Sequence, residues 1–350
     1  RYGCDFRQKA MGDGWRYAQH RRAGPFWKTC WPMSERRAAV DAFLSQAGWH
    51  SAARQSLAGD LSTRRYERLF KDGASAILMD AEDSMVPFLR MTAWLRDAGV
   101  SAPEVLAEDA VNGLILLEDF GDTSINTHIA EKGDATVIDN LCIDLLLALR
   151  AQAPPPLADP DAETLVEWTR LADAFYPGIR TTELDPFRLD LLQALRNILN
   201  TPRTISLRDF HADNLMWLPD RPGINALGLL DYQDAFVTHP AYDLVSYLTD
   251  ARVEVTRSRR NAVITAYLNR SGDNETQFQA AFAALSAQRN LRILGIFAKG
   301  ARFGKAHHVG KLPRVHSYFV EALEHEIFRD VRNQTIAALP DPNKIIEVLS

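Results

Sequence analysis

The sequence predicts an α+β fold, with strand-like segments and helices mixed before residue 120 and a mainly helical remainder. Strand-like apolar segments separated by turn residues gather before residue 120. After that point, apolar residues at helical spacing dominate. We predict helices over residues 34–48, 84–99, 135–151, 162–176, 186–200, 242–248 and 285–311.

Each predicted helix rests on an apolar stripe. Val40, Phe43 and Leu44 form the stripe of the first helix, and Phe88, Met91 and Leu95 that of the second. In the third helix the same reading places four side chains on one buried face, namely Val137, Leu141, Leu145 and Leu149.

Composition and charge limit the class of protein. With 350 residues, 46% of them hydrophobic, the chain can bury a core large enough for two lobes. A net charge of -5 argues against a nucleic-acid partner. No apolar run approaches the roughly 18 residues of a membrane helix. Three scattered cysteines fit a reducing compartment, so we expect a cytoplasmic enzyme.

Residues 204–234 carry the strongest chemical signal. Two short apolar runs lead to Asp209 and Asp231, so each predicted strand brings a carboxylate to its end. Asn214 follows Asp209 by five positions, which is the spacing of a kinase catalytic loop. We predict that Asp209 accepts the proton of the attacking hydroxyl. Asn214 and Asp231 would bind Mg²⁺, which prefers oxygen ligands.

The same stretch allows other interpretations. His211 and Asp213 could join Asp209 and Asp231 as ligands of a transition metal in a phosphohydrolase. A polar turn capped by Asp and Asn side chains, without chemistry, is the structural alternative.

Three stretches of the chain resemble the aminoglycoside phosphotransferase and choline kinase-like family: 207–214, 230–235 and 240–245. The resemblance implies a bilobal protein-kinase-like fold, with a small mixed N-terminal lobe that contains an antiparallel sheet and a larger, mainly helical C-terminal lobe. It also implies ATP with Mg²⁺, a small-molecule acceptor, and a role for Asp243 in bracing the catalytic loop. The family loop normally reads His-Gly-Asp, where this chain has Leu207, Arg208 and Asp209. This departure resembles the branch that phosphorylates N-acetylmuramate and N-acetylglucosamine at the anomeric hydroxyl.

With this resemblance the chain divides into three regions. Residues 33–120 would form the nucleotide-binding lobe and residues 121–350 the catalytic and substrate lobe. Residues 1–32 carry seven Lys or Arg against two Asp and show no apolar periodicity, which favours an unstructured basic extension. An arm that binds an unknown partner is the alternative.

A small-residue turn over 57–69 is the candidate phosphate-covering loop. Ser62 and Thr63 could approach the ATP phosphates, and Arg64 or Arg65 could add positive charge. An ordinary hairpin turn is the alternative. The next strand, over 76–81, lacks the lysine that kinases carry there, so we assign the missing charge to Arg64, Arg65 or Arg68. The missing lysine also leaves open a catalytically silent nucleotide-binding module.

Residues 113–122 read as the hinge between the lobes. The resemblance implies that adenine docks there on main-chain groups, which makes Glu118 and Asp119 nucleotide candidates. Their alternative role is to cap a helix that begins near Thr123.

Candidate acceptor residues lie after the catalytic loop. Asp234 belongs to the stretch 230–235, and Arg289 and Arg292 belong to the basic helix over 285–311. An arginine fork would match the carboxylate of an anionic sugar such as N-acetylmuramate. A solvated basic helix face is the alternative reading.

Overall fold

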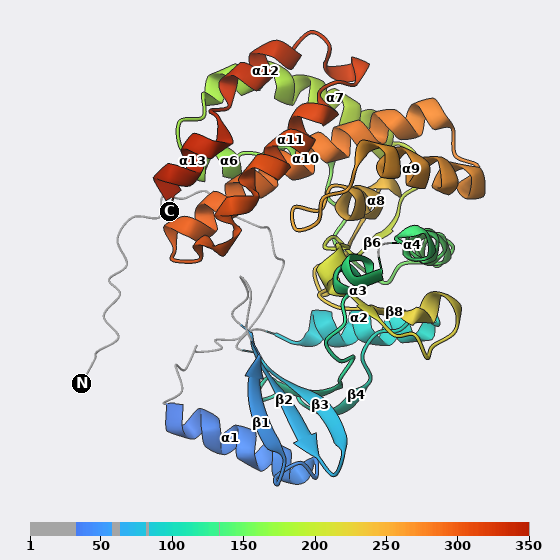
Figure 1. The fold of residues 1–350 in the computed structure, drawn as a ribbon, viewed down its shortest axis with the longest axis vertical. Helices are drawn as coiled ribbons and strands as arrows, with labels where there is room; N and C mark the ends of the chain where they lie inside the picture. Colours follow the sequence, from blue (N-terminus) through green and yellow to red (C-terminus); the bar gives the residue numbers. More distant parts are fainter. Residues whose placement is uncertain (1–32, 58–63, 82–83, 133, 350) are drawn as a thin grey trace.

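The computed structural model describes residues 33–57, 64–81, 84–132 and 134–349 (Figure 1). Five antiparallel strands form one sheet in the order β1-β2-β3-β5-β4. They are β1 (Ala53–Leu57), β2 (Arg65–Lys71), β3 (Ala74–Asp80), β4 (Val105–Asp109) and β5 (Leu114–Glu118). The basic extension 1–32 and the predicted phosphate residues Ser62 and Thr63 lie outside the described residues.

The β2–β3 hairpin shows why the sheet forms where it does. Its turn consists of Asp72 and Gly73, with φ values of 51° and 80°. An Asp-Gly pair accepts these angles readily, and the resulting turn has the twist that an antiparallel hairpin needs. The turn therefore fixes the register, which pairs Lys71 with Ala74.

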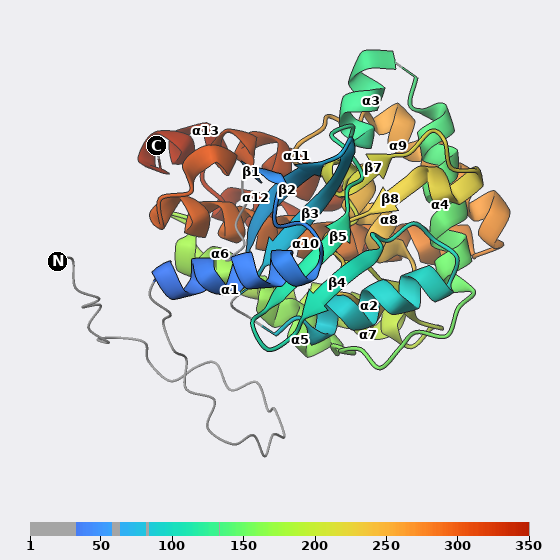
Figure 2. The same cartoon turned by 90° about the horizontal axis from the view of Figure 1, so that it is seen from below.

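Two helices pack with the sheet, one on each face. Alternate strand residues point to opposite faces, so Leu78 and Leu116 pack with α1 (Met33–Gln46). Met79 and Ile115 instead join the main core together with α2 (Val86–Asp97). Figure 1 shows α2 between the sheet and the helical region, and Figure 2 shows α1 on the outer face of the sheet.

The remainder is mainly helical, in agreement with the predicted α+β fold. Its α-helices are α3 (Ile125–Lys132), α4 (Thr136–Arg150), α5 (Ala162–Trp168), α6 (Leu171–Phe175), α7 (Asp185–Leu199), α8 (Ala241–Leu248), α9 (Arg257–Ser271), α10 (Glu275–Arg302), α11 (Leu312–Ala322), α12 (Arg332–Ala338) and α13 (Pro342–Leu349). The 3₁₀ turns are η1 (Thr181–Leu184), η2 (Ala212–Asn214), η3 (Gly223–Ala226), η4 (Ala306–Lys311) and η5 (Glu326–Phe328). Within the described ranges, every helix is too short or too polar to span a lipid bilayer.

The long helix α10 organises the helical region because α5, α6, α7, α8 and α11 all pack against it. At Gly295 the chain of α6 comes so close that a Cβ would lie 2.5 Å from the carbonyl carbon of Leu171. Only glycine allows this approach. The contact holds the middle of α10 in place.

Two sequence predictions in this region are wrong. The helix over 162–176 is in fact α5 and α6, and buried Thr169 between them accepts a hydrogen bond from the Arg188 guanidinium at 3.2 Å. Val137 is 59% exposed. Residues 137 and 149 are twelve positions apart, which turns them about 120° away from each other at 3.6 residues per turn. The buried face of α4 instead carries Ile138, Cys142, Leu145 and Leu149.

Two small antiparallel pairs interrupt the helical region. They are β6 (Thr204–Ser206) with β9 (Phe236–Thr238), and β7 (Leu215–Trp217) with β8 (Leu227–Leu229). The strands expected on either side of the catalytic stretch therefore exist. Ser101, which follows α2, bridges to Gly228 in β8, so the two regions are joined at this point.

Candidate active site

The loop between β6 and β7 is held by a buried carboxylate. Asp243 of α8 accepts hydrogen bonds from the backbone N–H of Leu207 at 2.7 Å and of Arg208 at 3.1 Å, and from the Ser206 hydroxyl at 2.7 Å. Burial raises the pKa of Asp243 to about 6, although these three donors favour its charged form. The bracing contact implied by the resemblance is therefore present.

A second buried carboxylate holds the other end of the loop. Asp250, just after α8, accepts a hydrogen bond from the Ala212 N–H at 3.1 Å and another from the Arg252 N–H at 2.8 Å. Arg208, whose N–H is bonded to Asp243, has a φ of 69°, which a side-chain-bearing residue rarely adopts. Such a conformation persists only where surrounding contacts fix it.

Asp231 follows β8 in a similarly constrained conformation, with a φ of 56°. The Gln233 amide donates a hydrogen bond to its Oδ1 at 2.7 Å. Its neighbour Tyr232 is buried, stacks on Phe88 of α2 with ring centroids 5.4 Å apart, and places its hydroxyl 2.7 Å from Thr92 Oγ1. Helix α2 thus fixes the backbone that carries Asp231.

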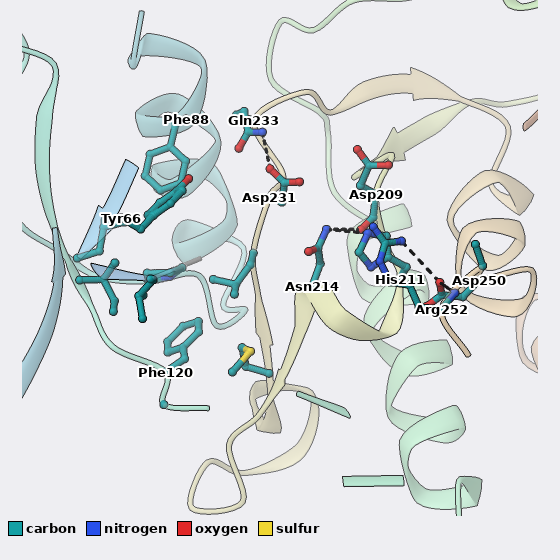
Figure 3. A pocket seen from close by; sticks show the side chains of 18 of the residues that line it. Tyr66, Phe88, Phe120, Asp209, His211, Asn214, Asp231, Gln233, Asp250 and Arg252 are labelled. Atoms are coloured by element: carbon teal, nitrogen blue, oxygen red, sulfur yellow. Dashed lines mark hydrogen bonds and ion pairs between the residues drawn. The ribbon is translucent and has the colours of Figure 1, made fainter. Parts of the chain in front are cut away.

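Asp209, Asn214 and Asp231 all line one cavity of about 550 Å³. In Figure 3, Tyr66, Phe88 and Phe120 lie at one end of this cavity. Asp209, His211, Asp250 and Arg252 gather at the other end, with Asn214 and Asp231 between the two groups (Figure 3). The cavity therefore has an apolar end next to the sheet and a charged end next to the helices.

Asn214 is oriented by the loop itself. Its Nδ2 donates to the backbone oxygen of Asp209 at 3.0 Å and lies 3.2 Å from His211 Nε2. The amide nitrogen is used by these contacts, so the amide oxygen is the atom left to face a ligand. Together with the Asp231 carboxylate it forms a set of oxygen donors of the type Mg²⁺ takes. The residues present fit this ion.

The two cavity carboxylates differ in electrostatics. Partial desolvation raises the pKa of Asp209, but Arg289, Arg208, His211 and Arg292 together outweigh it and hold that pKa below its ordinary value. Desolvation raises the pKa of Asp231; the Gln233 hydrogen bond opposes the rise and the charge of Asp209 adds to it. A bound cation would offset this unfavourable desolvation.

The candidate nucleotide arginines point in different directions. Arg64 is hydrogen-bonded to Tyr66. Its positive charge is also close enough to Asp231 to oppose the rise in the pKa of that carboxylate. Arg65 lies on the opposite face of β2, where its Nε is 3.6 Å from Asp80. It therefore points away from the cavity, contrary to the expectation that it contacts the phosphates. Arg68 does line the cavity, but its guanidinium pairs with Asp119 at 2.8 Å.

The side chains of Glu118 and Asp119, in the predicted hinge, form contacts within the protein. Glu118 forms an ion pair with Arg221, which also lies 5.1 Å from the centroid of the Phe120 ring. Asp119 accepts hydrogen bonds from Arg68 and from the Gly121 N–H. Neither caps α3, because the Ser124 hydroxyl accepts the capping bond from the Thr127 N–H at 3.2 Å.

Helix α10 supplies one wall of the charged end, with Arg289 and Arg292 followed by Ile293, Ile296 and Phe297. Asp234 does not join this wall. Its side chain is 62% exposed and lies 3.7 Å from the Arg208 guanidinium. The position of Asp234 therefore gives no support to the predicted contact between its side chain and an acceptor.

The alternative phosphohydrolase site is not assembled. Asp213 accepts a hydrogen bond from the Asn126 amide at 2.9 Å and pairs with Arg252 at 3.3 Å. Among the residues that the structure describes, no three His, Cys, Asp or Glu side chains are grouped so as to hold a metal ion. This arrangement disfavours a transition-metal hydrolase.

Sequence reasoning missed several residues of the cavity. Asp250 and Arg252 come directly after the helix that carries Asp243, and an Asp-x-Arg at that point was the only local signal. Tyr66, Phe120 and Met216 line the cavity, yet each looks like an ordinary core residue in the sequence. Only their convergence in space distinguishes them.

An antiparallel sheet joined by a hinge to a helical region, with carboxylates and an amide gathered in the cavity between them, defines a kinase-like phosphotransferase. The family model described as "Phosphotransferase enzyme family" matches residues 54–281, and the chain belongs to this family. It is a small-molecule kinase.

Two proteins with assigned names are similar to this chain over most of its length. A protein of Caulobacter vibrioides named N-acetylmuramate/N-acetylglucosamine kinase is 36% identical, over 81% of this chain and 92% of its own. A protein of the same name from Pseudomonas aeruginosa is 29% identical, over 80% of this chain and 87% of its own.

Solved structures confirm the fold. A microcompartment-associated aminopropanol kinase superimposes with a TM-score of 0.62 at 16% identity, covering 86% of this chain and 99% of its own. A choline/ethanolamine kinase family protein from Mesorhizobium loti gives a TM-score of 0.61 at 14% identity, covering 87% and 99%. At these identities the likeness concerns the fold alone.

Proposed function

We propose that the protein transfers the γ-phosphoryl group of ATP to the anomeric hydroxyl of N-acetylmuramate and N-acetylglucosamine, as a cytoplasmic step in the recycling of cell-wall sugars. The names of the relatives support the acceptor. The observation that carries the proposal is the convergence of Asp209, Asn214 and Asp231 on one cavity beside the hinge.

Asp209 is the proposed general base. Its carboxylate would accept the proton of the acceptor hydroxyl, a task for which it must be ionised. The neighbouring arginines keep its pKa low, which supports this role. Asp243 and Asp250 would act on Asp209 indirectly, by fixing the loop backbone so that the acceptor oxygen meets the carboxylate in a reactive orientation.

Asn214 Oδ1 and the Asp231 carboxylate are the groups that would hold Mg²⁺. When bound, this ion neutralises charge on the β- and γ-phosphates during transfer. The contribution of the chain is to present both oxygens from rigid backbone: Asn214 is tied to the main chain of Asp209, and Asp231 is followed by the buried Tyr232.

The nucleotide would occupy the apolar end of the cavity. Tyr66, Ile77 and Met216 offer apolar contacts for an adenine ring, and the main chain at Glu118 and Asp119 offers hydrogen-bonding groups. We propose Arg64, with Ser62 and Thr63, as the phosphate contact. A related aminoglycoside phosphotransferase structure holds ADP with hygromycin B, at 12% identity. This reading divides the chain at residue 120 into a nucleotide lobe and a catalytic lobe.

A substrate panel tests the proposal. ADP release is measured with N-acetylmuramate, N-acetylglucosamine, choline and an aminoglycoside, each at the same concentration of MgATP. We expect stimulation by the two sugars only. Stimulation by choline or the aminoglycoside, with none by the sugars, would reject the acceptor assignment.

The 1-O-methyl glycosides of both sugars then test the anomeric hydroxyl. Because these compounds lack a free hydroxyl at that carbon, they should give no stimulated ADP release. Phosphorylation of a methyl glycoside would place the reaction at another hydroxyl. A protein that binds ATP and releases no ADP with any acceptor would instead be a silent nucleotide-binding module.

A further inference from the structure

Arg289 and Arg292 lie three positions apart on α10 and therefore on the same face of the helix, and both line the cavity. Their surroundings differ. The Arg289 guanidinium is 3.7 Å from Asp209 Oδ1 and donates to the Ser246 hydroxyl at 2.6 Å. It also lies 5.9 Å from the centroid of the Tyr242 ring. Arg289 is thus already committed to contacts within the protein.

Arg292 has no such commitment. Its guanidinium lies 5.0 Å from the centroid of the Trp168 ring, and within the described part of the chain it forms no hydrogen bond or ion pair. Burial lowers its pKa, and the nearby Arg208 and Arg289 add to this effect, while Tyr242 and Asp209 oppose it. The five N–H donors of this half-buried guanidinium are therefore available to a ligand that brings hydrogen-bond acceptors into the cavity.

The position of Arg292 relates it to the acceptor rather than to the nucleotide. It lies one turn along α10 from Arg289, an axial rise of about 4.5 Å, and Arg289 contacts the proposed base. Ile293, Ile296 and Phe297 continue the same wall. An acceptor that gives its hydroxyl to Asp209 can therefore extend a second polar group toward Arg292 beside an apolar surface.

We infer that Arg292 is the specificity-determining residue for a carboxylate on the acceptor, and that it binds the lactyl carboxylate of N-acetylmuramate through a two-pronged hydrogen bond. This inference rests on the proposed function. The contact with the Trp168 ring, which Arg208 shares at 5.5 Å, would limit the rotamers of Arg292 before a carboxylate binds. N-acetylglucosamine has no such group, so its binding does not use this contact.

The test compares Arg292→Gln with the wild-type enzyme, using kcat/KM for both sugars. Loss of a charge-assisted bidentate contact should lower the ratio of kcat/KM for N-acetylmuramate to that for N-acetylglucosamine by about 10- to 100-fold. Arg292→Lys should recover part of this ratio because it keeps the charge without the fork. Arg302→Gln, an exposed arginine on the same helix, is the matched control and should leave the ratio unchanged.

A modified acceptor supplies the second half of the test. N-acetylmuramate with its lactyl carboxylate converted to the amide should be a poorer substrate of the wild-type enzyme than the natural acid, by a similar factor. With Arg292→Gln the acid and the amide should react alike, since the pairwise contact is already lost.

The opposing outcomes are distinct. An equal loss of kcat with both sugars would show that Arg292 acts on the transferred phosphoryl group, and an unchanged ratio would show that it does not contact the acceptor. Either result overturns the inference while the wild-type rates uphold the proposed function. A wild-type enzyme that phosphorylates neither sugar would overturn the proposed function, and the inference with it.

Discussion

Arg289 Nη2 lies 3.7 Å from Asp209 Oδ1, so a residue on the long helix α10 forms an ion pair with the loop between β6 and β7. Only 7% of the Arg289 side chain is exposed, whereas 37% of the Asp209 side chain is open to the cavity. The cation is therefore fixed by the protein, and the carboxylate remains accessible to an acceptor. This asymmetry suits a base that must stay charged and still meet its substrate.

Replacing Arg289 by Gln should move the acidic limb of the pH profile to higher pH. Arg289 lowers the pKa of Asp209, so its removal raises that pKa and leaves less ionised base at a given acidic pH. The measurement is kcat/KM against pH with N-acetylglucosamine, which lacks the carboxylate. Arg289→Lys should restore much of the profile, and an acidic limb that stays in place would contradict the role given to the ion pair.

Asp209→Asn should lower turnover by about 10²- to 10⁴-fold, the usual contribution of a general base. The variant keeps the shape of the side chain but cannot accept the proton. ATP affinity, measured by calorimetry, should remain within about threefold of wild type, because Asp209 lies at the charged end of the cavity. Asp144→Asn, at an exposed position on α4, is the control. Comparable turnover in Asp209→Asn would remove Asp209 from the chemistry.

Adjacent arginines give a matched pair for the phosphate contact. Arg64→Gln should raise the KM for ATP by about tenfold, the loss expected for one charge-assisted hydrogen bond. Arg65→Gln should change it little, because Arg65 faces Asp80 on the other side of β2. Initial rates at varied MgATP decide the point. An equal change of the KM for ATP in the two variants would mean that a residue other than Arg64 supplies the charge of the missing strand lysine.

Asp243→Asn should destabilise the fold by about 2–4 kcal/mol, since a buried amide cannot accept all three hydrogen bonds that the carboxylate accepts. The backbone N–H of Leu207 and the Ser206 hydroxyl would then compete for acceptors. Urea unfolding gives the free energy, and exposed Asp220→Asn is the control. A loss of activity without loss of stability would instead assign Asp243 a part in the chemistry.

His239 should make stability depend on pH. Burial lowers the pKa of His239 to about 4, and its Nδ1 accepts a hydrogen bond from the Ala241 N–H at 3.1 Å. In the unfolded chain the His239 imidazole takes up a proton near pH 6.5, whereas in the folded chain it does so only near pH 4. Stability should therefore fall as pH drops from 6.5 to 4, by about 3 kcal/mol at most.

His239→Asn isolates this effect, because asparagine can still accept the Ala241 bond but binds no proton. Asp243, with its raised pKa, acts in the opposite direction between about pH 6 and its unfolded value near 3.9. The quantity to plot is therefore the difference in unfolding free energy between wild type and variant at each pH. A difference that does not change over this interval would contradict the assignment.

The catalytic stretch could be predicted because its information is local. Short apolar runs end at Asp209 and Asp231, and the five-residue spacing to Asn214 is visible without knowing how the helices pack. For this reason the placement of these groups in one cavity could be expected in advance, and the α+β fold could be expected from the strand-like segments before residue 120 and the helical spacing after it. The brace at Asp243 was implied by the family resemblance of residues 240–245, not by the spacing of Asp209 and Asn214.

The remaining features could not be predicted, because they depend on which face of a strand or helix a residue occupies and on how distant segments pack together. Whether Arg64 or Arg65 faces the cavity is decided by the alternation of β2, and a shift of one position exchanges the two faces. Val137 was misplaced by a similar shift in helical phase. Asp250 and Arg252 line the cavity only because α8 ends beside the loop between β6 and β7, which no spacing in the sequence reveals.

The ion pair between Glu118 and Arg221 ties the end of the sheet to the segment before η3. With 28% and 33% of their side chains exposed, these two charges are reached by dissolved ions, which weaken their attraction. Under the proposed division of the chain at residue 120, an opening of the cavity would separate this pair. We therefore predict that higher ionic strength makes such an opening easier and raises the rates at which nucleotide enters and leaves.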